Sequence, residues 1–160
     1  MAQRHADNIA VDAPVPPTRA WPVESMSYLV WRSHLVFRRV LDNALAELSV
    51  NVAQVGMAAE LIERGPRTVA DLARISGVTP QGAALAASHL RKLGWVTPSG
   101  ASRRGRAVLL EITDAGRENH RKAARIIEQV EESMTSGITA AERAAACSAL
   151  RVIAGITTAP

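Results

Sequence analysis

Residues 68–94, with the sequence TVADLARISGVTPQGAALAASHLRKLG, contain the start and stop signals of two short helices. Thr68 and Asp71 have the spacing of a T-x-x-D capping box, which predicts a helix from about residue 69 to 76. Gly77 follows, and glycine readily takes the left-handed backbone conformation that ends many helices. The first half of this stretch therefore predicts one short helix with defined ends.

A second helix is expected after a short break. Thr79 is a good N-cap residue, and Pro80 suits the first helical position because the amide that it lacks would have no partner there. We expect this helix to cover residues 80–93 and to end at Gly94. Two helices joined by such a break have the spacing of a helix-turn-helix.

The residues after Gly94 predict two strands joined by a loop. WVTP, residues 95–98, is rich in β-forming residues, and RAVLLEIT, residues 106–113, alternates so that Leu110 and Ile112 share a face. SGASRRG, residues 99–105, lies between them and has the composition of a turn. Two strands directly after a helix-turn-helix form a winged helix, so the arginines of this loop are expected on the wing.

Helical patterns also precede this unit. Residues 24–48 repeat apolar side chains at threes and fours, which predicts a long amphipathic helix. Asn51 can cap a further helix over residues 52–64, which Gly65 and Pro66 would end.

Two more helices are expected after the wing. Thr113 can cap a long helix over residues 114–135 with one apolar stripe, and Thr139 with Glu142 opens a last helix over residues 140–156. The apolar faces of the first and last two helices exceed what the central unit can cover. We therefore expect them to form a dimerisation layer.

The expected fold is mainly α with a small β-wing (α+β). It divides into a proline-rich tail over residues 1–22, expected to be extended or disordered, an N-terminal dimerisation helix over 23–48, a winged helix-turn-helix DNA-binding domain over 51–113, and C-terminal dimerisation helices over 114–156.

Charge is concentrated in the centre of the chain. The net charge of +4 is modest, but residues 67–113 hold seven basic side chains against two acidic ones. A polyanion is the partner that such a distribution indicates.

Other function classes have no support in the sequence. No apolar stretch reaches the roughly 18 to 20 residues of a membrane helix, so we expect a cytoplasmic protein that does not bind membranes. Cys147 is the single cysteine, which excludes an intrachain disulfide or a thiolate zinc cluster. The histidines have no metal-ligand spacing, and no catalytic motif is present, so neither a metal, nor a cofactor, nor an enzyme is expected.

The order of elements, with GPRTVADLARISGVTPQGAALAASHLRKLGWV (residues 65–96) and GRAVLLEITDAGR (residues 105–117), resembles the MarR family of bacterial winged-helix regulators. The resemblance covers roughly residues 26–156. It implies a homodimer that binds double-stranded DNA at a pseudo-palindromic operator. It also implies a sequence-specific transcriptional regulator, commonly a repressor, which a small aromatic or anionic ligand releases from the DNA.

By the resemblance, residues 80–93 form the recognition helix, which enters the major groove with its N-terminal end first. The middle of this helix usually carries a polar or basic pair in the family, but here it holds Ala84 and Leu85. The candidate DNA-binding residues of this region are Thr79, Gln81, Leu85, Ser88, His89, Arg91 and Lys92. Solvation on an exposed helix face is the alternative for each of them.

The wing supplies the remaining candidates, Arg103, Arg104 and Arg106. Family wings commonly carry an aspartate two residues before the strand's arginine, and this chain has Arg104 there. A positive charge thus stands where relatives have the acidic partner of an ion pair, and the three arginines repel one another. We expect DNA phosphates or a narrow, electronegative minor groove to relieve this repulsion. A merely solvated run of charges is the alternative.

A ligand pocket is a further hypothesis. Tyr28, Trp31, His34 and Arg38 would stack on an aromatic anion and neutralise its charge. Aromatic residues at helical spacing also occur in an ordinary core or dimer interface.

The apolar run in the expected recognition helix also fits a second class of function. The run Ala83, Ala84, Leu85, Ala86, Ala87 offers apolar surface where base contacts are expected. A winged-helix module that binds a protein or a ligand, and binds DNA only weakly or non-specifically, would have such a helix.

Overall fold

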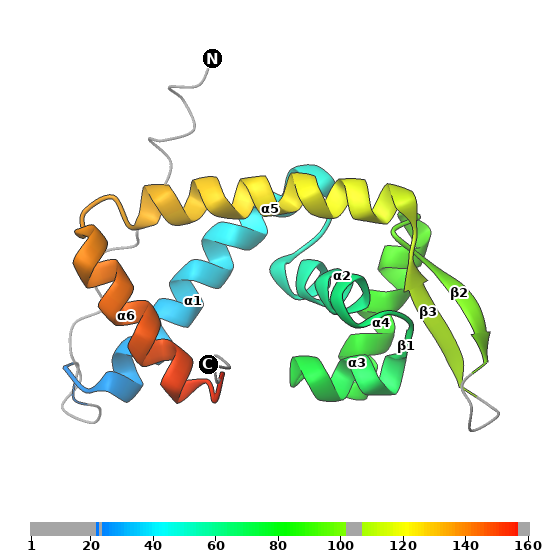
Figure 1. The fold of residues 1–160 in the computed structure, drawn as a ribbon, viewed down its shortest axis with the longest axis horizontal. Coiled ribbons are helices and arrows are strands. Elements are labelled where there is room, and N and C mark those ends of the chain that lie inside the picture. The colour runs from blue at the N-terminus through cyan, green and yellow to red at the C-terminus, as the bar shows by residue number, and fades with distance from the viewer. Residues whose placement is uncertain (1–21, 23, 102–106, 157–160) are drawn as a thin grey trace, which may run out of the picture.

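The structure is a computed structural model that describes residue 22, residues 24–101 and residues 107–156. Figure 1 shows a helical molecule with one small sheet. The helices are α1 (Met26–Leu45), the 3-10 helix η3 (Ala46–Leu48), α2 (Val52–Arg64), α3 (Val69–Ser76), α4 (Pro80–Lys92), α5 (Asp114–Met134) and α6 (Ala140–Ile153), and the strands are β1 (Arg67–Thr68), β2 (Val96–Ala101) and β3 (Val108–Ile112). The predicted α+β class is confirmed.

The caps expected from the sequence set the helix boundaries. The Asn51 side chain accepts a hydrogen bond from the Gln54 amide at 2.9 Å, and the Gln54 side chain accepts one from the Asn51 amide at 3.0 Å. Thr68 and Thr79 each accept from the amide three residues on, at the starts of α3 and α4. These bonds satisfy amides that a helix leaves unpaired, which explains why local sequence predicted α2, α3 and α4 so closely.

Two helix ends differ from the predictions. The first helix was expected to run to residue 48, but it turns into η3 after Leu45, and Ser49 follows in the left-handed conformation with φ 58°. The last helix was expected to reach residue 156 and instead ends at Ile153, because Gly155 takes φ 66° and the Ile156 amide donates to the Arg151 carbonyl.

The sheet contains a strand that the sequence did not predict. β3 lies between β1 and β2 and is antiparallel to both, with Arg67 opposite Leu110 and Val96 opposite Ile112. β1 has only two residues, one of which is also the N-cap of α3, so it is too short for a period-two pattern. β2 runs beyond residue 98 to Ala101 after a register shift.

The core lies under the sheet and among α2, α3 and α4. Leu61, Leu72, Leu90 and Trp95 are almost completely buried there. Leu110 and Ile112 share the inward face of β3, as the alternation predicted. Burial of these side chains holds α4 and the strands β2 and β3 in one unit.

A second group of helices lies at the other end of α5. Figure 1 shows α5 spanning the molecule, with α1 and α6 near one end and α2, α3, α4 and the sheet near the other. Among the described residues, α6 has no buried side chain, and α1 buries only Leu41 and Leu45. Most of the α1 and α6 surface is therefore accessible in the single chain.

No single helix among the described residues is long and apolar enough to cross a membrane. The segments Met26–Leu48 and Val52–Arg64 reach that length and composition only together, and the chain bends by 73° between them.

Candidate nucleic-acid interface

Helix α4 has a clearly divided surface. Ala83, Ala87 and Leu90 are buried and follow each other at helical spacing, so they mark the inward side. With about 100° of rotation for each residue, the opposite side is a line formed by Gln81, Leu85, Ser88 and Lys92, all of them exposed. We call these four residues the outward line.

The outward line holds most of the predicted contacts of this helix. Gln81, Leu85, Ser88 and Lys92 belong to it, and Arg91 is exposed beside it. The line begins with an amide side chain and ends with a positive charge. Between these ends lies Leu85, which is 67% exposed.

Two other predicted residues make contacts within the protein. Thr79 Oγ1 accepts the Gly82 amide at 3.1 Å as the N-cap of α4. His89 is half-buried, and its Nε2 donates to the Ser49 carbonyl at 2.7 Å. His89 thus ties α4 to the segment between α1 and α2. Sequence reasoning missed this contact because Ser49 lies 40 residues earlier in the chain.

The apolar run of α4 separates into two groups. Ala83 and Ala87 are buried in the core, and Ala86 is half-buried against it. Ala84 and Leu85 alone within the run are exposed. The surface available for an apolar partner is accordingly much smaller than the run in the sequence.

Helix α3 carries a cation that the sequence analysis did not assign. Arg74 Nη2 donates to Asp71 Oδ1 at 2.8 Å, and Thr68 Oγ1 donates to Asp71 Oδ2 at 2.8 Å. The hydrogen bonds from Arg74 and Thr68 lower the pKa of the Asp71 carboxyl. Arg74 remains 76% exposed at its side chain, and its place in the basic central segment was the available signal.

The three wing arginines, Arg103, Arg104 and Arg106, lie outside the described residues. The strands on either side of them are described. β2 ends at Ala101, which pairs with Val108 at the start of β3. Val108 is 55% exposed, whereas Leu110 and Ile112, further along β3, are buried.

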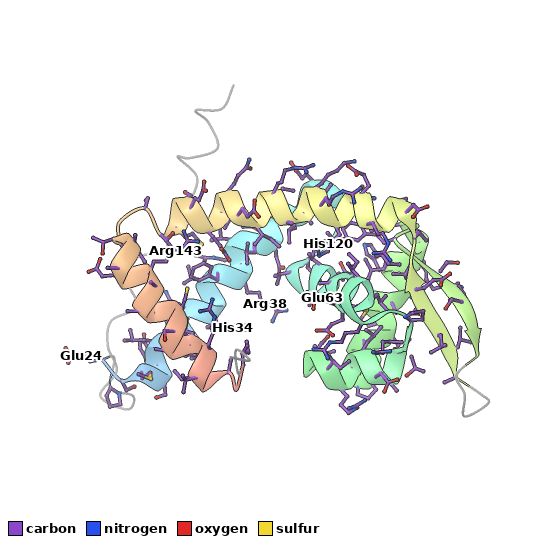
Figure 2. The ribbon with its side chains drawn as sticks, viewed as in Figure 1. Glu24, His34, Arg38, Glu63, His120 and Arg143 are labelled. Atoms are coloured by element: carbon purple, nitrogen blue, oxygen red, sulfur yellow. The ribbon has the colours of Figure 1, made fainter. Side chains whose placement is uncertain are left out.

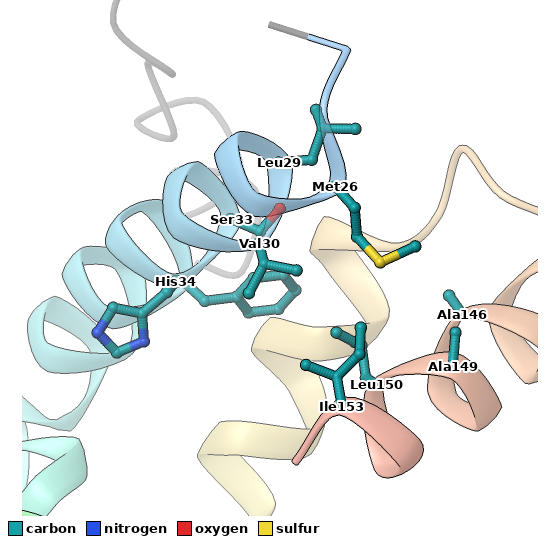
Figure 3. A pocket seen from close by; sticks show the side chains of 10 residues that line it. Met26, Leu29, Val30, Ser33, His34, Ala146, Ala149, Leu150 and Ile153 are labelled. Atoms are coloured by element: carbon teal, nitrogen blue, oxygen red, sulfur yellow. The ribbon is translucent and has the colours of Figure 1, made fainter. Parts of the chain in front are cut away.

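An apolar pocket lies between α1 and α6 (Figure 3). It has a volume of about 460 Å³ and is lined by Met26, Leu29, Val30, Ser33, His34, Phe37, Ala146, Ala149, Leu150 and Ile153. His34 is the one member of the predicted ligand site in this lining. The lining of the pocket is therefore mostly apolar and includes one titratable side chain, His34.

The other three predicted ligand residues lie elsewhere on α1. The Tyr28 and Trp31 rings are 5.8 Å apart between centroids and are inclined at 48°. Arg38 Nε lies 3.7 Å from Asp42 Oδ2, and Asp42 Oδ1 accepts the Val52 amide at 2.8 Å. The structure thus does not bring Tyr28, Trp31, His34 and Arg38 into one pocket.

His120 lies where α5 meets α2. Its ring is half-buried near Glu63 (Figure 2). Burial lowers the pKa of His120, and the charge of Glu63 opposes that shift only in part. The sequence offered no signal for this position, since His120 belongs to no motif.

This chain matches known proteins in structure but not in sequence. No protein-family model matches this sequence, and no curated protein matches it. Solved structures do match. Apo MarR from E. coli has a TM-score of 0.74 at 19% identity, over 82% of this chain and 98% of that one.

Two further structures agree. The transcriptional repressor CouR, bound to a 23-mer DNA duplex, has a TM-score of 0.73 at 21% identity, over 82% of this chain and 93% of that one. BpsR of Bordetella bronchiseptica, whose DNA binding is regulated by 6-hydroxynicotinic acid, has a TM-score of 0.72 at 20% identity, over 88% of this chain and 99% of that one.

The chain has the MarR fold.

The match to the MarR fold includes both groups of helices. Nearly the whole of each matched chain is covered, so α1 and α6 belong to the shared fold as well as the winged helix-turn-helix. The fold places α4 as the second helix of the helix-turn-helix, directly before the strands of the wing.

Proposed function

We propose that this protein is a homodimeric, sequence-specific DNA-binding regulator of transcription. The observation that carries the proposal is the outward line of α4, which leaves an amide, an apolar side chain, a hydroxyl and an ammonium group exposed on the second helix of a helix-turn-helix. This is the helix that enters the major groove in such motifs. Arg91 beside it and Arg74 on α3 add exposed cations for phosphates.

The accessible apolar surface of α1 and α6 supports the dimer. Met26, Leu29, Leu150 and Ile153 all line the pocket between these helices and are 47 to 63% exposed. Large apolar side chains gathered in this way favour burial against another molecule. A second copy of the chain would cover them, and its two-fold symmetry would match a pseudo-palindromic operator.

Repression with release by a ligand forms the finer part of the proposal. CouR is a repressor with the same fold, and 6-hydroxynicotinic acid regulates DNA binding by BpsR. We infer that this chain represses transcription in the cytoplasm and releases DNA on binding a small aromatic or anionic compound. Of the four residues expected to bind this compound, His34 lines the apolar pocket and is the candidate contact for its charge.

The ligand proposal is tested by displacement. 6-Hydroxynicotinate, benzoate and a neutral aromatic amide are titrated into a preformed protein–DNA complex. Release by the acids, with His34→Ala needing higher concentrations and Arg32→Ala behaving like the wild type, supports the ligand site. Release by none of the three, or release unaffected by His34→Ala, would remove this site from the proposal.

A protein-binding or ligand-binding module with weak DNA affinity is the second candidate. Its supporting observation is the exposed apolar pair Ala84 and Leu85 at the centre of α4.

Selection from a random duplex pool distinguishes the two candidates. The full chain is incubated with the pool at physiological salt, and bound duplexes are amplified and sequenced over several rounds. A regulator enriches an inverted repeat with half-sites about one helical turn apart. A module enriches no common sequence, and that result would overturn the proposed function.

A further inference from the structure

Leu85 is the largest exposed apolar side chain on α4, and it lies at the centre of the outward line. It is 67% exposed, on the opposite side of the helix from Ala83, Ala87 and Leu90, each of which is at most 3% exposed. Gln81 lies one turn before it and Ser88 about one turn after it. A surface that packs against this side of α4 therefore contacts Leu85.

The major groove offers few groups that suit a leucine side chain. Guanine, cytosine and adenine present hydrogen-bond donors and acceptors there, and the C5-methyl group of thymine is the apolar exception. The same methyl group is carried by 5-methylcytosine. Against a G·C pair, Leu85 would displace water from polar atoms without replacing their hydrogen bonds, and such desolvation is unfavourable.

We propose that Leu85 reads a pyrimidine 5-methyl group in the major groove of each operator half-site. This inference rests on the proposed function and names the DNA that it recognises. Leu85 favours a methylated pyrimidine by apolar contact and disfavours an unmethylated G·C pair by desolvation. Discrimination therefore comes from a repulsive element as well as an attractive one.

The spacing along α4 adds a second requirement. Gln81 and Leu85 are separated by about 6 Å along the helix axis and lie on the same side of α4. An amide side chain pairs with the N6 and N7 atoms of adenine. The half-site is thus expected to carry an adenine for Gln81 near the methylated pyrimidine for Leu85.

The test removes only the methyl group. In the duplex obtained by selection, each thymine of a half-site is replaced singly by deoxyuracil, which keeps every hydrogen-bonding atom. Affinity is measured by fluorescence anisotropy for the wild type, for Leu85→Ala, and for the control Val152→Ala, whose side chain is 80% exposed on α6. Alanine is a strong helix former and Leu85 is outside the core, so Leu85→Ala is expected to fold.

One thymine in each half-site should be sensitive. Its replacement by deoxyuracil should weaken binding about fourfold for each half-site, the value of one buried methyl group. Leu85→Ala should bind the two duplexes equally, and Val152→Ala should discriminate like the wild type. A C·G pair at that position should bind weakly, and 5-methylcytosine should recover about fourfold, which separates the methyl group from the thymine ring as its source.

Three results overturn the inference. The first is an operator without any position sensitive to deoxyuracil, and the second is sensitivity that persists in Leu85→Ala. The third is failure of 5-methylcytosine to improve on cytosine. In each of these cases the selected operator still binds, so the proposed function stands. If selection yields no operator, the proposed function and this inference fail together.

Discussion

Gly116 lies where the first turn of α5 meets the backbone of Trp95. A Cβ atom built on this glycine would lie 2.1 Å from the Trp95 carbonyl oxygen and 2.8 Å from Ile112 Cδ1. Thr113 Oγ1 donates to the Gly94 carbonyl at 2.6 Å in the same joint and accepts the Gly116 amide at 2.9 Å. The absence of a side chain at residue 116 therefore allows α5 to start against the base of the wing.

Replacing Gly116 by alanine should destabilise the protein by about 2 to 3 kcal/mol, because the backbone must move to make room. Urea denaturation measures the effect. Gly56→Ala is the matched control, since Gly56 lies within α2 and a Cβ there meets no atom within 4 Å. The control should gain about 0.5 to 1 kcal/mol from helix propensity. Equal effects of the two substitutions would contradict this account of the joint.

His120 predicts how stability depends on pH. Its pKa is lowered in the folded protein from the ordinary value of 6.5, chiefly by burial. The unfolded chain therefore binds the proton more readily, so stability is full above pH 6.5 and falls as the pH drops from there toward the folded-state pKa. His120→Gln should remove part of this loss between about pH 7.5 and 5. Glu63→Gln should steepen it, because the carboxylate favours the protonated ring. Identical curves for all three proteins would contradict the assignment.

At the residue scale, the sequence predicted which side chains of a helix are exposed better than it predicted which residues they contact. The outward position of Gln81, Leu85 and Ser88 follows from helical period, which a sequence contains. The bond from His89 to Ser49 and the packing of Gly116 depend on chain segments far apart in sequence. No local pattern encodes those contacts, and the same reason explains why the four candidate ligand residues were grouped although the pocket includes only His34.

At the element scale, helix boundaries were the most predictable feature. Asn51, Thr68, Thr79 and Thr113 cap their helices with bonds that span three residues, so local sequence contains the whole interaction. β1 was missed because its two residues become a strand only by pairing with β3. Strand identity in so short a segment depends on the partner and not on the segment.

The charge of the wing should determine how DNA affinity depends on salt concentration. If Arg103, Arg104 and Arg106 of each protomer neutralise phosphates, the dimer makes about six such contacts, and log affinity should fall with log salt at a slope of about −5. Replacing all three by alanine should weaken binding to every duplex and flatten the slope. An unchanged slope in the triple variant would exclude the wing arginines from phosphate binding.

The α1 and α6 surfaces are the elements on which the proposed dimer depends. Leu150→Lys or Ile153→Lys would place a charge in the pocket between these helices, where the partner is expected. Either variant should shift the protein toward the monomer by about tenfold or more in dissociation constant, as measured by analytical ultracentrifugation. Val152→Lys is the control, because Val152 is 80% exposed and is not part of the pocket lining. A dimer unaffected by Leu150→Lys and Ile153→Lys would place the interface elsewhere.

At the scale of the whole molecule, one long helix joins two parts with different surfaces. The end near the sheet buries a continuous core and exposes polar and basic side chains on α4, whereas the end near α6 exposes apolar ones. A core at one end and exposed apolar surface at the other fit the proposed function, in which one end contacts DNA and the other contacts a second copy of the chain. The arrangement follows from the fold, which is shared with structures no more than 21% identical to this chain.

Competition at physiological salt tests the central claim most directly. A labelled duplex from the region upstream of the protein's own gene is bound by the full chain and challenged with unlabelled random duplex. We predict that two protomers bind each duplex and that the complex survives about a hundredfold excess of random competitor, while the same unlabelled duplex displaces it at about equal concentration. Displacement by random and upstream DNA at the same concentration would contradict the claim that this protein is a sequence-specific regulator.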